Sequence, residues 1–280
     1  MPKKFVKLDS QILTAFSTCE RKMEYGFIRH LQLIEAKYAL ERGSLIHDIL
    51  ECYYKELKES RNRIASVKKA LELGRAKINT YNSIDVPRGI EILDNMGQYF
   101  SYYMNDKWLP VETEKIHKKL IFEDEELAIL YIAKIDVVVM GDDQFPLMPV
   151  DHKGYDRWFD PLSLDNQFTG YANQLDVNCI TVNKIGFQKS YTADKKFRRV
   201  KLTYTEARRA EWVHNTARLV KDMVFCMETG TFPMRRSQCG MYGGCDMLKI
   251  CEIDPRAREM VIQKLYRVTE PWDPEKASYD

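Results

Sequence analysis

The sequence has no long hydrophobic run and little net charge. No window reaches the roughly 18 consecutive apolar residues of a membrane span, and the start "MPKKFVKLDSQILTAF" lacks the uninterrupted apolar region of a secretion signal. We therefore expect a soluble, cytoplasmic chain that makes no membrane contact. The 43 basic and 41 acidic residues nearly cancel, which leaves +2. Any nucleic-acid-binding surface would thus have to be a local patch of positive charge.

Internal repeats, low-complexity segments and clear linkers are also missing from the sequence. The chain has 280 residues, of which 45% are apolar, so it can bury a sizeable core and an active site. We expect one domain over residues 1–280.

Cysteine is present in an odd number, seven residues, which disfavours a complete disulfide framework in an intracellular chain. The stretch "QCGMYGGCDMLKIC" places Cys239, Cys245 and Cys251 at intervals of six residues. Tight C-x₂₋₄-C pairs, which are typical of structural zinc, do not occur there. Metal binding by a C-terminal segment, residues 231–255, is the favoured interpretation, and a fourth ligand is missing from that segment.

Helical periodicity dominates the first hundred residues. We predict a first helix with Ser10 as its N-cap and a break near Cys19, then helices around 41–60, 62–82 and 88–107, with residues 48–110 forming a helical lobe. The first two helices are expected to bury an apolar face formed by Ile12, Leu13, Phe16, Met23, Phe27, Leu45, Ile46, Ile49, Leu50, Tyr53 and Leu57.

The hydrophobic pattern changes at about residue 112. Three apolar runs separated by "EDEE" and "GDDQFP" predict three strands joined by two turns. A helix at about 163–180, two further strands, "KIGFQKSYT" and "FRRVKLTYT", and a long helix at about 205–228 follow. This order predicts an α/β fold with a central mixed sheet and flanking helices, in which residues 112–230 form the catalytic core.

Two acidic residues and a lysine should converge on this sheet. Asp136 in "AKIDVVV" and Asp151 in "LMPVDHKG" lie on consecutive strands of one expected hairpin. Lys153 follows Asp151 by two residues and therefore lies on the same strand face. Two neighbouring carboxylates stay ionised only with a cation between them, so a divalent metal is expected. Such a metal and an ammonium group are what phosphodiester hydrolysis requires.

These segments resemble the PD-(D/E)xK nucleases, and "GSLIH" and "QFTGY" resemble motifs of their RecB-like branch, which includes CRISPR-associated exonucleases. The resemblance implies Mg²⁺ or Mn²⁺ bound by His47, Asp136, Asp151 and the main-chain carbonyl of His152. It also implies a catalytic role for Lys153, with Gln167 and Tyr171 in the motif that follows. Relatives often carry a glutamate before the first core strand, and here either Glu112 or Glu114 could be the equivalent residue.

A subset of this branch carries a 4Fe-4S cluster, held by one cysteine near the N-terminus and three after the nuclease core. "FSTCERKMEYGFI" resembles the N-terminal part of that pattern, which implies Cys19 as the fourth ligand beside Cys239, Cys245 and Cys251. Glu20 replaces the proline that often follows the first cysteine, and the C-x-x-C pair of better-known members is not present. Cys52, Cys179 and Cys226 match no motif position and are expected to be core thiols.

The leading hypothesis is a metal-dependent DNA nuclease, and specifically an exonuclease. Its expected substrate is single-stranded DNA or DNA with free ends, in DNA processing, recombination or repair. Recombination or replication proteins are its expected protein partners. The alternatives are a DNA-binding or assembly subunit with a structural nuclease fold, and a redox protein, for which flavin, nicotinamide and second-cluster motifs are missing. In the lobe, aromatic and basic side chains could either bind DNA or pack against the core; these are Lys68, Lys69, Arg75, Tyr99, Phe100, Tyr102, Tyr103 and Lys107.

Overall fold

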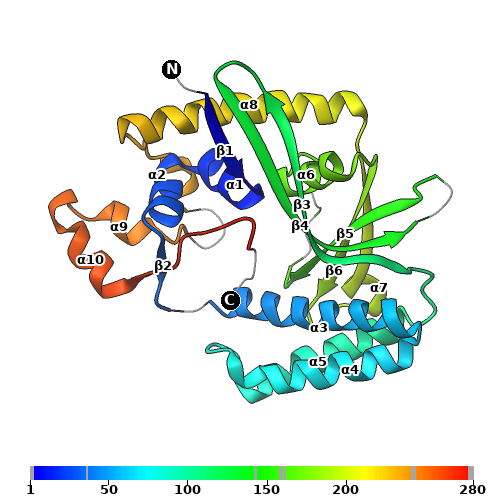
Figure 1. Cartoon of the computed structure of the whole chain (residues 1–280). Coiled ribbons are helices and arrows are strands. Elements are labelled where there is room, and N and C mark those ends of the chain that lie inside the picture. The colour runs from blue at the N-terminus through cyan, green and yellow to red at the C-terminus, as the bar shows by residue number, and fades with distance from the viewer. Residues whose placement is uncertain are drawn as a thin grey trace. The chain divides into compact units, whose positions relative to one another are not determined.

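A six-stranded mixed sheet forms the centre of the fold (Figure 1). The computed structural model describes residues 3–35, 37–141, 144–157, 160, 162–240 and 244–276. The strand order is β1-β4-β5-β6-β7, and β3 also pairs with β4. The strands are β1 (Lys4–Leu8), β3 (Pro110–Glu123), β4 (Leu127–Met140), β5 (Leu147–Tyr155), β6 (Cys179–Gly186) and β7 (Phe197–Thr203). The predicted α/β fold with a central mixed sheet and flanking helices is therefore confirmed.

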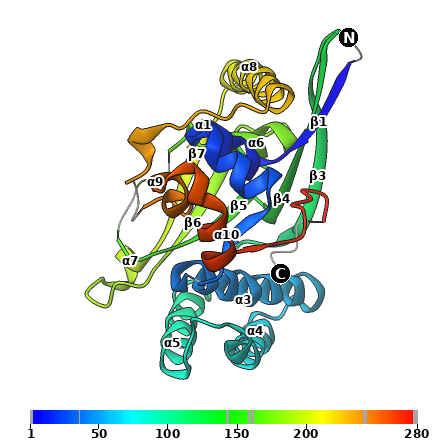
Figure 2. The same ribbon diagram turned by 90° about the vertical axis from the view of Figure 1, so that its left-hand side faces the viewer.

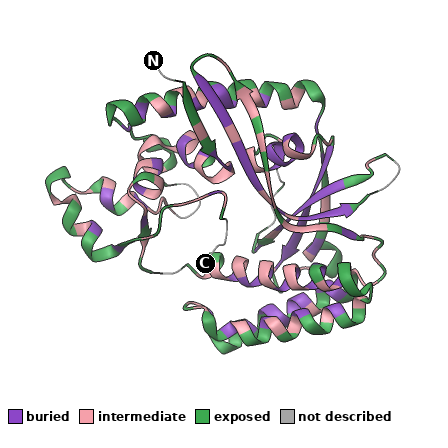
Figure 3. Ribbon diagram, in the orientation of Figure 1, coloured by how far each residue is buried: buried purple, intermediate pink, exposed green. Residues whose placement is uncertain are grey.

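The sheet contains both parallel and antiparallel pairs of strands. Strand β1 pairs in parallel with β4. Strands β4 and β5 form the expected antiparallel hairpin, with Val137 opposite Val150. Strand β6 then pairs in parallel with β5, and β7 pairs antiparallel with β6. All eight residues of β6 are buried, so both faces of the sheet are covered at that strand. The central strands of the sheet are largely purple in Figure 3, the colour of buried residues.

The chain forms two compact units. Within the described residues, one unit comprises residues 3–35, 118–133 and 207–276, and the other comprises residues 37–117 and 134–206. Strands β3 and β4 are long and contribute to both units. The helices of the described residues are all too short or too polar to cross a membrane.

In the second unit, three helices lie side by side (Figure 2). They are α3 (Tyr38–Ser60), α4 (Arg63–Lys77) and α5 (Val86–Tyr102), close to the predicted helical stretches. The side chains of Asn62 and Asp85 cap α4 and α5 by accepting backbone N–H groups. Tyr99 and Phe100 are 1% and 3% exposed. Of the two alternatives for the aromatic side chains of the lobe, DNA binding or packing against the core, packing is therefore confirmed for these two residues.

Two shorter α-helices lie further along the chain in this unit. Helix α6 (Asn166–Leu175) follows β5, and α7 (Ala193–Lys196) joins β6 to β7. Asp165 caps α6, and the helix ends at Asp176, which adopts a left-handed conformation with φ of 51°. The predicted helix over 163–180 was therefore too long at both ends. Cys179 is buried, as expected for a core thiol.

The first unit contains β1, the strand pair β2 (Leu31–Leu33) and β8 (Tyr266–Val268), and several helices. Its helices are α1 (Ser10–Thr18), α2 (Glu20–Met23), the π-helix η1 (Glu24–Ile28), α8 (Glu206–Thr229), α9 (Leu248–Glu252) and α10 (Arg258–Leu265). A small core forms around Tyr25, Leu31 and Ile250.

Two predictions for the first hundred residues were wrong. Ser10 is not the N-cap of α1: Asp9 occupies that position, and its carboxylate accepts the N–H groups of Gln11 and Ile12. Strands β1 and β2 also interrupt the expected helical region. Each pairs with a strand far along the chain, β4 or β8, so no local pattern could reveal it. The predicted break at Cys19 is present between α1 and α2.

Candidate active site

Three side chains of the second unit point their ligand atoms toward one another. His47 comes from α3, Glu114 from β3 and Asp136 from β4, and their ligand atoms all lie within 4.8 Å of one another. His47 Nδ1 lies 3.6 Å from Asp136 Oδ2. An imidazole nitrogen and two carboxylates form a donor set that suits a divalent metal such as Mn²⁺ or Mg²⁺.

Glu114, and not Glu112, belongs to this group. Its backbone has φ of 50°, which is rare for a residue with a side chain and costs on the order of 1–3 kcal/mol. The Glu114 carboxylate lies 2.7 Å from Lys134 Nζ, two residues before Asp136. Glu112 instead pairs with Lys115 and His117. The structure thereby separates two glutamates that the sequence left equivalent.

A hydrogen-bonded chain connects the predicted lysine to the predicted Gln–Tyr pair. Lys153 Nζ lies 2.9 Å from Asp151 Oδ2 and donates to Gln167 Oε1 at 2.9 Å. Gln167 Nε2 donates to the Tyr171 hydroxyl at 2.9 Å, and that hydroxyl donates to the carbonyl of Lys134 at 2.8 Å. Gln167 and Tyr171 are therefore part of one network with Lys153 and not a separate surface pair.

His152 makes contacts through both its backbone and its side chain. The His152 N–H donates to Asp136 Oδ2 at 2.8 Å, which fastens Asp136 to the neighbouring strand. The imidazole is buried, stacks on Tyr54 at 5.4 Å between ring centroids, and lies 2.8 Å from Asn183 Nδ2 through its Nδ1. Burial lowers the pKa of His152 well below its usual range, which keeps the ring neutral.

The electrostatics of the site favour a bound cation. Burial and the Asp151 carboxylate raise the pKa of Asp136 to about 8, and burial and Asp136 raise the pKa of Glu114 to about 7. Burial would lower the pKa of Lys153, but Asp151 and Asp136 outweigh it and raise that pKa. Surrounding protein and Lys153 lower the pKa of His47, so its imidazole is in the neutral form that binds metals. A divalent cation would replace the protons that these acids otherwise retain.

The four cysteines named by the sequence pattern all lie in the first unit. Cys19, Cys239, Cys245 and Cys251 are half-buried and free of disulfide bonds. Burial raises the pKa of Cys251, the cation of Arg21 lowers it, and the thiols of Cys245 and Cys19 raise it. Three of the four thiols therefore share one neighbourhood, although among the described residues no three cysteine sulfurs lie within 4.8 Å of one another.

Comparison with protein families decides where this fold belongs. The family model of the PD-(D/E)XK nuclease superfamily matches residues 10–252. The chain belongs to this superfamily. PD-(D/E)XK nucleases use divalent metals, and the group formed by His47, Glu114 and Asp136 supplies a possible acidic metal site. A PD-(D/E)XK nuclease fold also implies nucleic-acid binding.

Two solved structures are similar to this chain to different degrees, and the first of them shares its fold. The crystal structure of a candidate exonuclease from Eubacterium rectale aligns over 89% of both chains, with a TM-score of 0.55 and 12% sequence identity. The structure of LHK-Exo in complex with dAMP aligns over 66% of this chain and 93% of that chain, with a TM-score of 0.34 and 10% identity. A comparison with curated proteins found no match.

Proposed function

We propose that this protein is a metal-dependent deoxyribonuclease of the RecB-like branch that degrades DNA from free ends during DNA processing, recombination or repair. The observation that carries the proposal is that Asp136 of the His47–Glu114–Asp136 group accepts the N–H of His152 at 2.8 Å. His152 stands between Asp151 and Lys153, so the Asp151–Lys153 pair lies next to this group. Phosphodiester hydrolysis requires a metal site and a fixed positive charge. The carboxylates and the imidazole supply the first, and the lysine ammonium supplies the second. The candidate exonuclease from Eubacterium rectale supports the choice of this activity only through the shared fold.

His47, Asp136, Asp151 and the His152 carbonyl would hold the metal, and Glu114 joins them on the evidence of its position. The ion supplies Lewis-acid activation of the phosphodiester and of the attacking water. Lys153, held between Asp151 and Gln167, places its charge where negative charge develops during cleavage. Tyr171 fixes the orientation of Gln167 and thereby the position of the lysine. Tyr171, which also reaches the Lys134 carbonyl, is thus a positioning residue.

The activity is tested with labelled linear single-stranded, linear double-stranded and covalently closed circular DNA. We expect the purified protein to degrade linear DNA with Mg²⁺ or Mn²⁺, to leave closed circles intact, and to be inactive in EDTA. Asp151→Asn removes one carboxylate charge from the site and should abolish cleavage. Cleavage that persists in EDTA, or in Asp151→Asn, would mean that the activity does not come from this site.

If the wild type binds DNA but cleaves none of these substrates with either metal, the alternative of a DNA-binding or assembly subunit is favoured. Cutting of closed circles would instead retain the nuclease and exclude a strict requirement for ends. One set of reactions thus distinguishes three possibilities: a nuclease that requires free ends, a nuclease that does not, and a DNA-binding or assembly subunit without activity.

We also propose that Cys19, Cys239, Cys245 and Cys251 hold a 4Fe-4S cluster. Four thiolates carry excess negative charge, which nearby cations stabilise. Arg21 and Arg258 are such cations, since their positive charges lower the pKa of Cys251. The Arg235 N–H donates to Cys19 Sγ at 3.4 Å, which is the kind of hydrogen bond that tunes such clusters. One ligand lies at the α1–α2 junction and three lie between Cys239 and Cys251, so a cluster would join that junction to α9 and the segment before it.

Anaerobically purified protein should contain iron and sulfide and absorb broadly at roughly 400 nm. Cys19→Ala should bleach this absorption and lower the melting temperature, because the cluster closes a loop of more than 200 residues. Cys52→Ala, which changes a half-buried cysteine of the other unit, is the matched control and should keep its colour. Stoichiometric zinc without iron in anaerobic material would contradict the proposal.

A further inference from the structure

A second lysine lies inside the candidate active site. Lys134 is on β4, two residues before Asp136, so the two side chains share one face of the strand. The Lys134 ammonium lies 2.7 Å from Glu114 Oε2, and only 19% and 11% of these two side chains are exposed to solvent. The resemblance to known nucleases gives a role to Lys153 and none to Lys134. Water therefore screens this second cation little from the carboxylates around it.

Lys134 connects the metal-ligand group to the hydrogen-bonded chain of Lys153. Its side chain pairs with Glu114, and its carbonyl accepts the Tyr171 hydroxyl at 2.8 Å. Tyr171 accepts from Gln167, which in turn accepts from Lys153. The backbone and the side chain of Lys134 are thus both engaged within the site, so the position of its charge is well defined.

The ion pair helps to hold Glu114 in an unfavourable backbone conformation. A residue with φ of 50° keeps that conformation only where its surroundings stabilise it. The ligand atoms of Glu114 and Asp136 lie within 4.8 Å of each other, and two carboxylates at that distance repel each other when both are ionised. The Lys134 ammonium opposes this repulsion. In the metal-free protein it therefore stabilises the acidic group as a bound cation would.

The charge of Lys134 acts on all three side chains of the metal-ligand group. Burial has the largest influence on their pKa values: it raises those of Glu114 and Asp136 and lowers that of His47. The charge of Lys134 has a smaller influence, and it lowers all three pKa values. A positive charge that disfavours a proton at each of these side chains also repels a metal ion that they bind together.

The charges of the site residues suit a singly charged phosphodiester. Three carboxylates contribute negative charge when ionised, those of Glu114, Asp136 and Asp151. Two ammonium groups, of Lys134 and Lys153, contribute positive charge. One divalent metal would change the excess of one negative charge into an excess of one positive charge, which one phosphodiester neutralises. Without Lys134, the same site with its metal would be neutral and would attract that anion less.

We infer that Lys134 is a positioning residue that acts through Glu114 and adapts the metal site to a nucleic-acid phosphate: its charge weakens binding of the metal and strengthens binding of the phosphate beside it. This inference rests on the proposed nuclease function and adds to it a residue that sets the balance between the two ligands. Effects of opposite sign follow from charge, because a cation repels a metal ion and attracts a phosphate. A purely structural role predicts changes of the same sign for both ligands.

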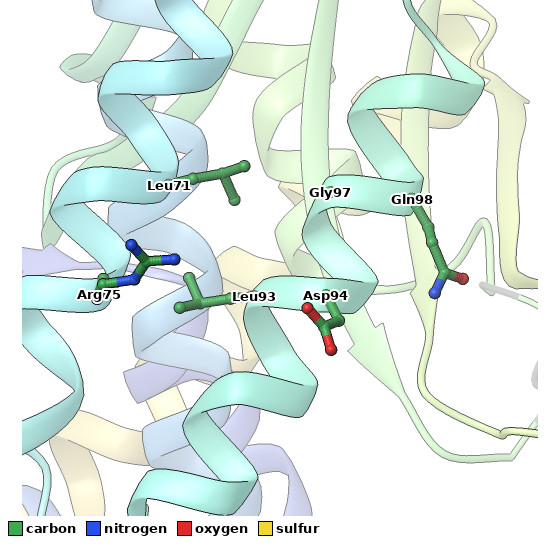
Figure 4. Close-up of a pocket in the computed structure, with 6 residues that line it drawn as sticks. All are labelled: Leu71, Arg75, Leu93, Asp94, Gly97 and Gln98. Atoms are coloured by element: carbon green, nitrogen blue, oxygen red, sulfur yellow. The ribbon is translucent and has the colours of Figure 1, made fainter.

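The cations of α4, which the sequence suggested for DNA binding, provide a control. Lys68 and Lys69 each lie beside a glutamate, and Lys69 pairs with Glu56. Arg75 lines a pocket of about 370 Å³ between α4 and α5, and Figure 4 shows Asp94 among the α5 residues that line the same pocket. Arg75 is thus a cation of the same unit that shares a pocket with a carboxylate but has no contact with the metal-ligand group in the described residues.

The test measures two affinities by titration calorimetry: that for Mn²⁺ alone, and that for thymidine 5′-monophosphate with saturating Mn²⁺. Lys134→Met keeps most of the side-chain volume and removes the charge. It should bind Mn²⁺ about tenfold more tightly and the monophosphate about tenfold more weakly than the wild type. Arg75→Met, the matched control, should equal the wild type in both affinities. Thymidine, which lacks the phosphate, should bind the wild type and both variants alike.

Lys134→Arg keeps the positive charge and should restore both affinities to nearly those of the wild type. If Lys134→Met does not fold, Lys134→Gln removes the same charge and should show the same pair of opposite changes. Weaker binding of both ligands, or an unchanged affinity for either, overturns the inference, while the nuclease proposal stands as long as the wild type cleaves DNA. A wild type that binds no Mn²⁺ and cleaves no DNA would overturn the proposed function itself.

Discussion

Replacing Lys153 with methionine is expected to slow metal-supported DNA cleavage by about 10²-fold or more and to leave DNA affinity nearly unchanged. The Lys153 ammonium is fixed by Asp151 and Gln167, at 2.9 Å from each. A charge that is already in place stabilises the transition state, where negative charge grows, more than it stabilises the bound substrate. Methionine keeps the length of the side chain but removes that charge, so the loss should appear in kcat and not in KM.

Lys115→Met is the matched control, because Lys115 pairs with Glu112 outside the His47–Glu114–Asp136 group. Both variants are purified side by side with the wild type, and single-turnover rates are measured with Mg²⁺ and with Mn²⁺. Equal rates in wild type and Lys153→Met would assign the activity to a contaminant or to a different site. A large loss of activity in Lys115→Met would show that the effect is not specific to Lys153.

Replacing Asp136 with asparagine is expected to abolish metal-supported cleavage and to raise the stability of the metal-free protein above neutral pH. In the folded protein, burial and Asp151 raise the pKa of Asp136 to about 8, against about 3.9 in an unfolded chain. The folded state therefore binds more protons, so Asp136 lowers stability as pH rises from about 4 to 8. Asparagine lacks this titration, and its side-chain oxygen can still accept the His152 N–H.

Thermal unfolding in EDTA at about pH 6 and pH 8 measures this effect. The variant should gain most at the higher pH, by at least about 2 °C, which corresponds to about 1 kcal/mol in a protein of this size. Added Mn²⁺ should stabilise the wild type and not the variant. Glu112→Gln is the control, since Glu112 lies outside the metal-ligand group. Lower stability of Asp136→Asn at both pH values would contradict the electrostatic argument.

Much of the fold follows from local sequence patterns. The helices of the lobe, the β3–β4–β5 strands, β7 and α8 all appear where periodicity and turn residues predict them. The strand predicted at "KIGFQKSYT" was placed too late, because β6 spans Cys179–Gly186 and so begins where the preceding helix was expected to end. Strands β1 and β2 were not predicted, because their partners are more than 100 residues away and their pairing is therefore not local. Ends of elements were less accurate: Asp9 was missed as the cap of α1 because Ser10, beside it, has an equally suitable side chain.

The candidate active site divides in the same way. Asp151 and Lys153 share a strand face because side chains alternate with a period of two, and Asp136 is near them because β4 and β5 form a hairpin. The sequence alone determines that much. His47, Gln167 and Tyr171 entered through resemblance to a family, and their convergence in space depends on how α3 and α6 pack on the sheet.

Only the tertiary structure distinguished Glu114 from Glu112. Two residues apart on a regular strand, they would share a face, but the positive φ of Glu114 breaks the alternation and gives each glutamate different partners. The register that sets Lys153 opposite Lys184, and Lys184 opposite Arg198, is a further case. Register across a helical crossover is set by the packing of the whole sheet, since a shift of one residue would turn each side chain to the other face.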